Sequence, residues 1–217
     1  MIKKQRTYLG ISIGLLVLFL VWTTLICVID VQTIGPDGSA VGIATVNQFV
    51  HDLSGTHMML YVITDWLGLV PFGIIFLFAL VGLSQWIRRR KISLVDADLL
   101  LLGVFYILVL AAYLIFEVVI VNYRPILIDG KLEASYPSST TMLVMCVIPT
   151  AIMFLQRRIN TRIFNVLMVA VLSGFAVFMV IARLASGVHW FSDIIGGILL
   201  SAALNFSYRF GLSLIRK

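Results

Sequence analysis

The sequence is poor in charged residues and in cysteine. Only 12% of its 217 residues are Asp, Glu, Lys or Arg, whereas 61% are hydrophobic. Soluble domains carry about 25% charged and about 45–50% apolar residues. The two cysteines, Cys27 and Cys146, fall near or within apolar runs, so a disulfide framework is not expected. These deficits argue against an ordinary soluble domain and favour a membrane protein.

The sequence contains several long apolar runs that carry few charged residues. A membrane-spanning helix needs about 20 largely apolar residues, and the connections between the runs are too short for a separate soluble domain. We therefore predict an all-α fold, a polytopic bundle of six transmembrane helices that forms one membrane-embedded domain over residues 1–217. The predicted spans are residues 8–29, 58–86, 97–122, 138–156, 163–182 and 190–209.

The basic residues gather on one predicted side of the membrane. Thirteen of the 16 Lys and Arg residues lie in the two tails and in alternate connections, as the positive-inside rule predicts for cytoplasmic segments. Both termini are therefore expected in the cytoplasm, and the net charge of +6 indicates topology rather than nucleic-acid binding. The three exceptions, Arg124, Lys131 and Arg183, fall on the opposite side.

The first outer connection, residues 30–57, contains an amphipathic segment. Apolar residues recur at Val46, Phe49, Val50 and Leu53, which is the spacing of one helix face. We expect this helix to lie on the outer membrane surface and to pack against the bundle. A lid over a lipid entrance is the alternative.

Three polar side chains fall close together beside the last predicted span: Arg183, His189 and Asp193. His189 and Asp193 are four residues apart, so they would share one face of a helix. A carboxylate placed there can bond one ring nitrogen and leave the other aimed at a substrate. The guanidinium of Arg183 can grip two phosphate oxygens at once. The pattern favours a phosphate site, and a structural Arg–Asp pair beside an interfacial histidine is the alternative.

A second polar set comes from the preceding outer connection. Arg124 follows the third predicted span, and Ser138, Ser139 and Thr140 begin the fourth. Hydroxyls at such a position are ordinary N-caps, but a helix N-terminus also binds anions through its free N–H groups. Because this helix start and Arg124 lie on one side of the membrane with Arg183, we favour an anion site.

These residues, in this order, resemble the signatures of the type 2 phosphatidic acid phosphatases, which are related to bacterial undecaprenyl-diphosphate phosphatases and vanadium haloperoxidases. The first signature is Lys, six residues, Arg-Pro; the second is Pro-Ser-Gly-His; the third is Ser-Arg, five residues, His, three residues, Asp. The matching residues are Arg124-Pro125, Pro137-Ser138 and Arg183, His189 and Asp193, with Ala182 in place of the third signature's Ser.

The resemblance implies a two-step phosphatase that uses no cofactor and no metal. His189 would attack phosphorus and form a phosphohistidine, while Asp193 orients the ring. Arg124, Arg183 and the helix start at Ser138 would stabilise charge on the phosphate oxygens. Water would then release phosphate.

Two of the departures from the family pattern bear on its chemistry. Glu117 stands where the family has its Lys, seven residues before Arg124, a spacing that would put both on nearly the same helix face. It is expected either to orient an arginine or to stay protonated and donate. Thr140 stands in place of the histidine that protonates the leaving group. Lys131 and His57 are the auxiliary candidates for the missing positive charge and the missing acid.

The favoured function is hydrolysis of a lipid phosphate at the outer face. A diphosphate expels a phosphate ester, which needs less acid catalysis than an alkoxide, so an isoprenyl diphosphate such as undecaprenyl diphosphate is favoured over phosphatidic acid. A degenerate lipid-phosphate-binding member and a lipid phosphotransferase are the alternatives. The expected partners are the lipid substrate and the bilayer, and the expected location is the bacterial cytoplasmic membrane, as a multi-pass protein. The oligomeric state is not predicted.

Overall fold

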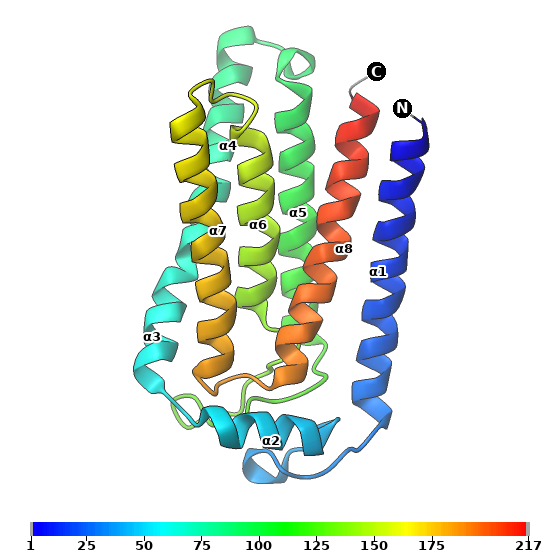
Figure 1. The fold of residues 1–217 in the computed structure, drawn as a ribbon, viewed down its shortest axis with the longest axis vertical. Helices are drawn as coiled ribbons and strands as arrows, with labels where there is room; N and C mark the ends of the chain where they lie inside the picture. Colours follow the sequence, from blue (N-terminus) through cyan, green and yellow to red (C-terminus); the bar gives the residue numbers. More distant parts are fainter. Residues whose placement is uncertain (1, 216–217) are drawn as a thin grey trace.

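The computed structural model describes residues 2–215 and is a bundle of long helices that run between two ends (Figure 1). The predicted all-α fold is confirmed. The helices are α1 (Ile2–Val28), α2 (Ala44–Ser54), α3 (Met58–Leu67), α4 (Leu69–Arg89), α5 (Ala97–Val118), α6 (Ser139–Leu155), α7 (Arg162–Ala185) and α8 (Phe191–Ile215), with single 3-10 turns at Pro36–Gly38 and Ile92–Leu94.

Five of the six predicted spans are confirmed as helices long and apolar enough to cross a membrane. The sixth, α6, is an apolar helix of only 17 residues, about 25 Å long. It is the central helix and contacts α4, α5, α7 and α8, and its residues are mostly buried by them. Its shortness follows from its position, because a helix surrounded by others does not have to match the full thickness of the lipid.

The second predicted span is broken near its outer end, between α3 and α4. Pro71 has no N–H, and its ring clashes with the carbonyl four residues earlier in a regular helix. A turn at Gly68 interrupts the regular helix before Pro71 and so avoids this clash. The Gly68 N–H donates to the carbonyls of Thr64 and Asp65 at 2.9 and 3.1 Å. The span therefore bends where it passes the start of α6.

The predicted span 97–122 ends too late. The helix α5 stops at Val118, so Glu117 and Arg124 do not lie on one helix, and the expectation that they share a helix face is wrong. Conversely, α7 continues to Ala185, three residues beyond the predicted end, so Arg183 belongs to the last turn of this helix.

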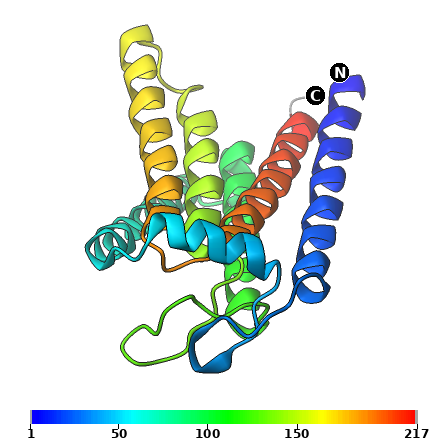
Figure 2. The ribbon, with the colours of Figure 1, turned by 60° about the horizontal axis from the view of Figure 1, so that its bottom comes forward.

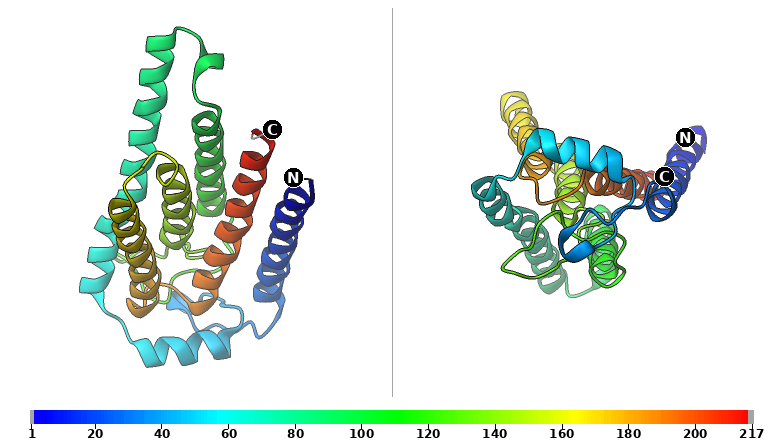
Figure 3. Two further views of the ribbon diagram at one scale, coloured as in Figure 1. Left: turned by 45° about the horizontal axis from the view of Figure 1, so that its top comes forward. Right: turned by 90° about the horizontal axis from the view of Figure 1, so that it is seen from below.

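Both ends of the described chain lie at one end of the bundle, and α2 crosses the other (Figures 1 and 2). The view from below shows α2 lying across the ends of the long helices (Figure 3). Its polar Asn47 is fully buried, whereas Phe49 and Leu53 are 62% and 72% exposed. The expected packing against the bundle is thus made by the polar side of α2, and its apolar side faces outward.

The loops at this end are held together by close backbone approaches. Gly187, in the loop between α7 and α8, has φ +69°, and a Cβ there would collide with the carbonyl of Gly55. In α8, a Cβ on Gly196 would collide with the ring of Tyr136. The glycines therefore let the loop before α3 and the loop before α6 reach the start of α8.

Candidate active site

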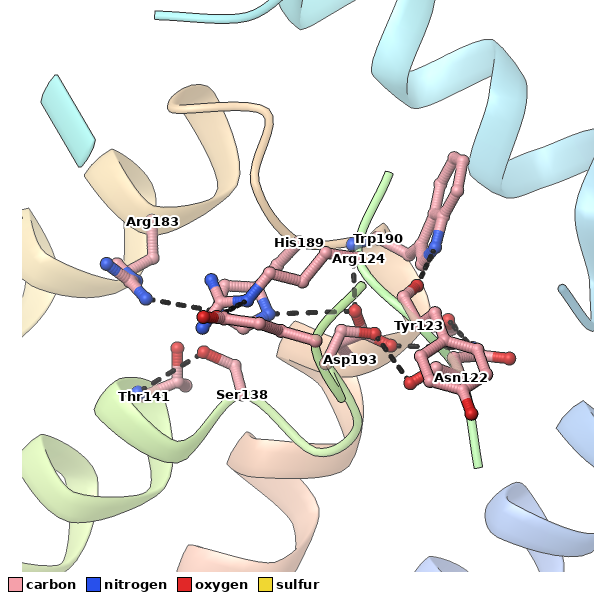
Figure 4. A network of polar contacts seen from close by, with 12 residues as sticks. Asn122, Tyr123, Arg124, Ser138, Thr141, Arg183, His189, Trp190 and Asp193 are labelled. Atoms are coloured by element: carbon pink, nitrogen blue, oxygen red, sulfur yellow. Dashed lines mark hydrogen bonds and ion pairs between the residues drawn. The ribbon is translucent and has the colours of Figure 1, made fainter. Parts of the chain in front are cut away.

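The candidate site lies at the end of the bundle that α2 crosses, where the loops before α6 and α8 meet (Figure 4). Its central residue is His189, which sits between the last turn of α7 and the first turn of α8 and is 3% exposed. The backbone N–H of His57 donates to the carbonyl of Ser186 at 3.0 Å. This bond helps to hold the loop that carries His189.

The two ring nitrogens of His189 face different partners. Nη2 of Arg183 lies 3.1 Å from Nε2. Because a guanidinium can only donate, Nε2 must be the acceptor and the ring proton must sit on Nδ1. Nδ1 lies 3.7 Å from Oδ2 of Asp193, within reach of an ion pair but longer than a hydrogen bond. The predicted grouping of Arg183, His189 and Asp193 is therefore present, although His189 precedes the helix that carries Asp193.

Asp193 is fully buried and held by neighbouring donors. Its Oδ2 accepts from the backbone N–H of Trp190 at 2.9 Å, and Nδ2 of Asn122 lies 3.5 Å from Oδ1. The carbonyl of Asp193 accepts from the N–H of Ser138 at 3.0 Å. The carboxylate thus has a fixed orientation, and its backbone joins the start of α8 to the start of α6.

A layer of buried polar side chains lies behind Asp193. Asn47 of α2 accepts from the Ser192 N–H at 3.0 Å and donates to the Ser192 Oγ at 2.9 Å. Asn47 therefore acts as an N-cap for α8 from another helix. Nδ2 of Asn122 also lies 3.4 Å from the Ser192 Oγ. Through Ser192, this layer connects α2, the loop before Arg124 and the helix that carries Asp193.

Two guanidinium groups lie at the site, and both approach the ring of Tyr61 in α3. The Cζ atoms of Arg183 and Arg124 are 5.2 and 5.9 Å from the centre of that ring, distances at which a cation is attracted to an aromatic face. Arg183 is 1% exposed and its Nη1 donates to Oγ1 of Thr64 at 3.3 Å. Nε of Arg183 and Nη1 of Arg124 are buried with no hydrogen-bond partner among residues 2–215. They are donors that a ligand can satisfy.

Carboxylates also approach these arginines. Nε of Arg124 lies 3.0 Å from Oε2 of Glu133, and Nη1 of Arg183 lies 3.9 Å from Oδ1 of Asp65. Glu117 makes no ion pair with either arginine in the described part of the chain. Glu133 and Asp65, rather than Glu117, are thus the carboxylates beside the two arginines, and α5, which carries Glu117, ends before Arg124.

The first turn of α6 faces the same space. The Ser138 side chain caps the helix by accepting from the Thr141 N–H at 3.5 Å, so its hydroxyl is already used. The N–H groups of Ser139 and Thr140 occupy the first two helical positions, where no carbonyl of the same helix can accept from them. Ser139 and Thr140 are only partly buried, and they place a helix N-terminus beside the two arginines.

A cavity of about 610 Å³ joins these groups. A small void lined by His189 adjoins it and shares four of its lining residues, which places the histidine at the inner edge of the cavity. The polar residues that line the larger cavity are Tyr61, Asp65, Tyr113, Glu117, Tyr123, Arg124, Glu133, Ser139, Thr140 and Arg183.

The two remaining auxiliary candidates lie elsewhere. His57 is exposed, and its Nε2 lies 2.9 Å from the carbonyl of Ser54. Lys131 is exposed in the turn that follows Ile128. Neither residue lines the cavity. Within residues 2–215, no group of three or more His, Cys, Asp and Glu side chains is placed to hold a metal ion.

The surroundings of His189 oppose its protonation. Burial lowers the pKa of His189 well below its usual range, and the positive charges of Arg124 and Arg183 lower it further. The ring is therefore neutral at pH 7, with a lone pair on Nε2. A neutral imidazole in contact with a guanidinium combines a nucleophile with a group that binds phosphate oxygens.

Several residues of the site were missed by sequence analysis. Tyr61 and Thr64 lie three residues apart in an apolar helix, on the face that meets α7. Together with Asp65, they form a polar patch at helical spacing that the sequence does display. Asn122 and Glu133 lie in a loop with no such periodicity, so only the folded chain brings them to Asp193 and Arg124.

Comparison with known proteins agrees with this geometry. Residues 119–211 match the model of the PAP2 superfamily. The fold is similar to a crystal structure described as the first transmembrane PAP2-type phosphatidylglycerolphosphate phosphatase from Bacillus subtilis, with a TM-score of 0.54 and 20% sequence identity, covering 95% of this chain and 98% of that one. No curated protein sequence is significantly similar to this chain. Residues 119–211 therefore match the PAP2 superfamily, and they lie in a polytopic helical bundle whose overall fold is similar to that of a transmembrane PAP2-type protein.

Proposed function

We propose that the chain is a lipid-phosphate phosphatase that uses His189 as its nucleophile. The observation that carries the proposal is the neutral, buried ring of His189, with Nε2 beside Arg183 and Nδ1 beside Asp193. A neutral imidazole held in one tautomer is the form that attacks phosphorus.

In the first step, Nε2 of His189 forms a bond to phosphorus while the bond to the leaving oxygen breaks. The positive charge that develops on the ring is stabilised by the carboxylate of Asp193, which lies 3.7 Å from Nδ1. In the second step, water attacks phosphorus in the phosphohistidine and the N–P bond breaks. Inorganic phosphate is released, and the free histidine is regenerated.

Charge on the phosphate oxygens needs donors that are already in place. Nε of Arg183 and Nη1 of Arg124 have no hydrogen-bond partner among the residues that the structure describes, and the N–H groups of Ser139 and Thr140 lie at the helix start. These donors come from three elements: α7, α6 and the loop that follows α5. Together they would hold the phosphoryl group at the inner edge of the cavity, next to His189.

The leaving group distinguishes the candidate substrates. Thr140 lines the cavity where the family pattern has its acid, and a threonine hydroxyl cannot donate a proton as readily as an imidazolium. A diphosphate expels a phosphate ester, a weaker base than the alkoxide that a monophosphate expels. We therefore infer that an isoprenyl diphosphate, such as undecaprenyl diphosphate, reacts faster than phosphatidic acid, at the outer face of a bacterial cytoplasmic membrane.

One observation favours a second candidate, a member that binds lipid phosphates without turning them over. Glu133 and Asp65 already approach the two arginines, and Glu117 adds a third carboxylate to the cavity wall. Ionised carboxylates at these positions would repel a phosphate.

The deciding experiment measures phosphate release from undecaprenyl diphosphate and from phosphatidic acid by the purified protein, with His189→Ala beside it. Acid quenching with a radiolabelled substrate would trap the phosphohistidine. Release and labelling that both disappear in His189→Ala are expected. A folded protein that binds both lipids and releases phosphate from neither would support the lipid-binding candidate, and equal release by His189→Ala would refute the histidine mechanism.

A further inference from the structure

The cavity beside His189 carries more negative than positive charge. Two guanidinium groups line it, those of Arg124 and Arg183, together with the three carboxylates of Asp65, Glu117 and Glu133. With two positive and three negative groups ionised, the net charge of the wall is −1. A phosphate monoester brings about 1.5–2 further negative charges near pH 7. A ligand whose only charged group is a phosphate is therefore a poor electrostatic match for the cavity as a whole.

The positive charges lie deeper in the site than the carboxylates. Arg183 contacts Nε2 of His189 at 3.1 Å, and its side chain is 1% exposed. The side chains of Asp65 and Glu133 are 62% and 41% exposed, and Glu117 is exposed as well. A phosphate held by the buried donors would thus leave the carboxylates for a second group of the same ligand.

Glu117 is the carboxylate of this cavity that no cation of the described chain neutralises. Glu133 lies 3.0 Å from Nε of Arg124, and Asp65 lies 3.9 Å from Nη1 of Arg183. Within residues 2–215, Glu117 forms no ion pair with a lysine, arginine or histidine. An ionised carboxylate in a cavity wall is stabilised by a cation, and here a ligand would have to supply it.

Glu117 lies close to the expected position of the phosphate and next to aromatic rings. It lines both the large cavity and the small void that contains His189. Tyr113, four residues earlier in α5, interacts with it through its hydroxyl, and both Tyr113 and Tyr123 line the cavity. An ammonium is attracted to a carboxylate and to the face of a tyrosine ring. Glu117 and these rings therefore have the composition of a site for an organic cation.

We propose that this cavity recognises a lipid phosphate that carries an ammonium group next to the phosphate, as in a 2-aminoalkyl phosphate. The phosphate would accept hydrogen bonds from Arg124 and Arg183, and the ammonium would pair with Glu117. Such a ligand supplies the positive charge that the wall lacks. The inference rests on the proposed function for the position of the phosphate, and it gives Glu117 a role in binding and none in the chemical steps.

Two kinds of lipid contain this unit. In a sphingoid base phosphate, the amine belongs to the lipid chain and the phosphate is a monoester. In phosphatidylethanolamine, the amine belongs to the headgroup and the phosphate is a diester. Because the proposed reaction hydrolyses a terminal phosphate, we expect the monoester to be the ligand.

Binding of four probes to the delipidated His189→Ala protein tests the proposal without turnover. The probes are sphingosine 1-phosphate, phosphatidylethanolamine and the N-acetyl derivative of each, which keeps the phosphate and loses the positive charge. We expect sphingosine 1-phosphate to bind about tenfold more tightly than its N-acetyl derivative. A preference confined to phosphatidylethanolamine would assign the same chemistry to a diester headgroup. Equal binding of the amine and N-acetyl forms in both pairs would overturn the proposal.

Glu117→Gln in the same background removes the charge and keeps the size of the side chain. The preference for the amine form should then fall to about twofold or less, and Glu117→Asp, which keeps the charge, should retain most of it. The matched control is Asp129→Asn, which removes an exposed carboxylate of the connection between α5 and α6 that does not line the cavity. The preference should not change in this control. An undiminished preference in Glu117→Gln, or an equal loss in Asp129→Asn, would refute the assignment to Glu117.

Phosphate release by the wild-type protein separates this inference from the proposed function. Faster release from sphingosine 1-phosphate than from its N-acetyl derivative would support both. Equal release from the two, with equal binding, would refute the ammonium site and leave the phosphatase in place. A binding preference for the amine with no release from any lipid would support the ammonium site and refute the phosphatase.

Discussion

The two halves of the candidate site are built differently. In the half formed by α7 and α8, Arg183, His189 and Asp193 are 1%, 3% and 0% exposed. In the half formed by α5, α6 and the loop between them, Glu117 is exposed and Thr140 is only partly buried. The first half buries the proposed nucleophile, His189, whereas the second opens onto the cavity.

This difference separates two chemical tasks. Two departures from the family pattern, Glu117 and Thr140, fall in the open half, which would face the leaving group in the proposed mechanism. The buried half matches the pattern at each of its three polar residues. Under the proposed mechanism, this arrangement would retain the residues that form the phosphoryl–histidine bond and change those that select the leaving group. The following predictions test whether the two halves can be altered independently.

The largest effect is expected from Asp193→Asn in the buried half. Asparagine keeps the shape and can still accept from the Trp190 N–H, but it removes the charge that stabilises a positive His189 ring. Loss of such a carboxylate lowers kcat by about 10⁴-fold in a comparable histidine–aspartate arrangement. The measurement is steady-state phosphate release from undecaprenyl diphosphate.

Asp65→Asn, in α3 outside the buried half, is the matched control. Asp65 is 62% exposed and lies 3.9 Å from Arg183, so its loss should change kcat by less than about tenfold, as an exposed ion pair contributes little. Comparable losses in Asp65→Asn and Asp193→Asn would contradict the distinction between the two halves.

The next effect is expected from Thr140→His in the open half. A histidine at this helix position would face the cavity and supply the acid that the chain lacks. General acid catalysis contributes about 10²–10⁴-fold, most of it for poor leaving groups. We therefore expect the rate on phosphatidic acid to rise by about 10–100-fold relative to the rate on undecaprenyl diphosphate.

The ratio of the two kcat/KM values measures this change, and Thr140→Asn serves as the control of similar size without an acid. If Thr140→His and Thr140→Asn change the ratio equally, the leaving-group argument is wrong. A rise in both rates without a change in ratio would indicate better phosphate binding instead.

Much of the fold was predictable from the sequence because hydropathy alone separates apolar spans from loops. The position of α7 and α8 and the grouping of Arg183, His189 and Asp193 followed from spacing. The early end of α5 did not, since residues 119–122 are mostly apolar and nothing in their pattern marks a stop. For the same reason, the sequence pointed to Glu117 as a candidate partner for an arginine, whereas the carboxylate beside Arg124 is that of Glu133.

The periodicity of the sequence was least able to predict which polar side chains are buried. The apolar stripe of α2 was identified correctly, yet the side that packs on the bundle is the polar one, with Asn47 at its centre. A polar side chain is buried only when a specific partner is present. That partner, Ser192, lies 145 residues away along the chain. A local sequence pattern therefore cannot predict the contact.

The pH dependence of the rate provides a smaller test, which asks how the charge of Arg124 in the open half affects His189 in the buried half. His189 must be neutral to attack, and its pKa is lowered by burial and then by the charges of Arg124 and Arg183. The acid limb of kcat/KM is therefore expected below pH 6.5, the ordinary value for histidine. Arg124→Gln removes one positive charge, raises the pKa of His189, and should move the acid limb to higher pH.

Arg124→Lys keeps the charge and should keep the acid limb in place even if substrate binding weakens. A wild-type acid limb at or above pH 6.5 would contradict the assignment of His189 as a buried neutral nucleophile. An equal shift in Arg124→Gln and Arg124→Lys would assign the change to altered geometry rather than to charge.

The smallest effect is expected behind the buried half, at Asn47. Asn47→Ala leaves the N–H and the hydroxyl of Ser192 without the partner that α2 supplies, and an unsatisfied buried polar group costs about 1–3 kcal/mol. Thermal unfolding in detergent should show this loss. Gln48→Ala, the neighbouring position, removes only an exposed contact with Asp52 and should change stability by less than about 0.5 kcal/mol. Because Ser192 precedes Asp193, Asn47→Ala should also lower kcat more than it changes KM; a stability loss with an unchanged kcat would limit α2 to a structural role.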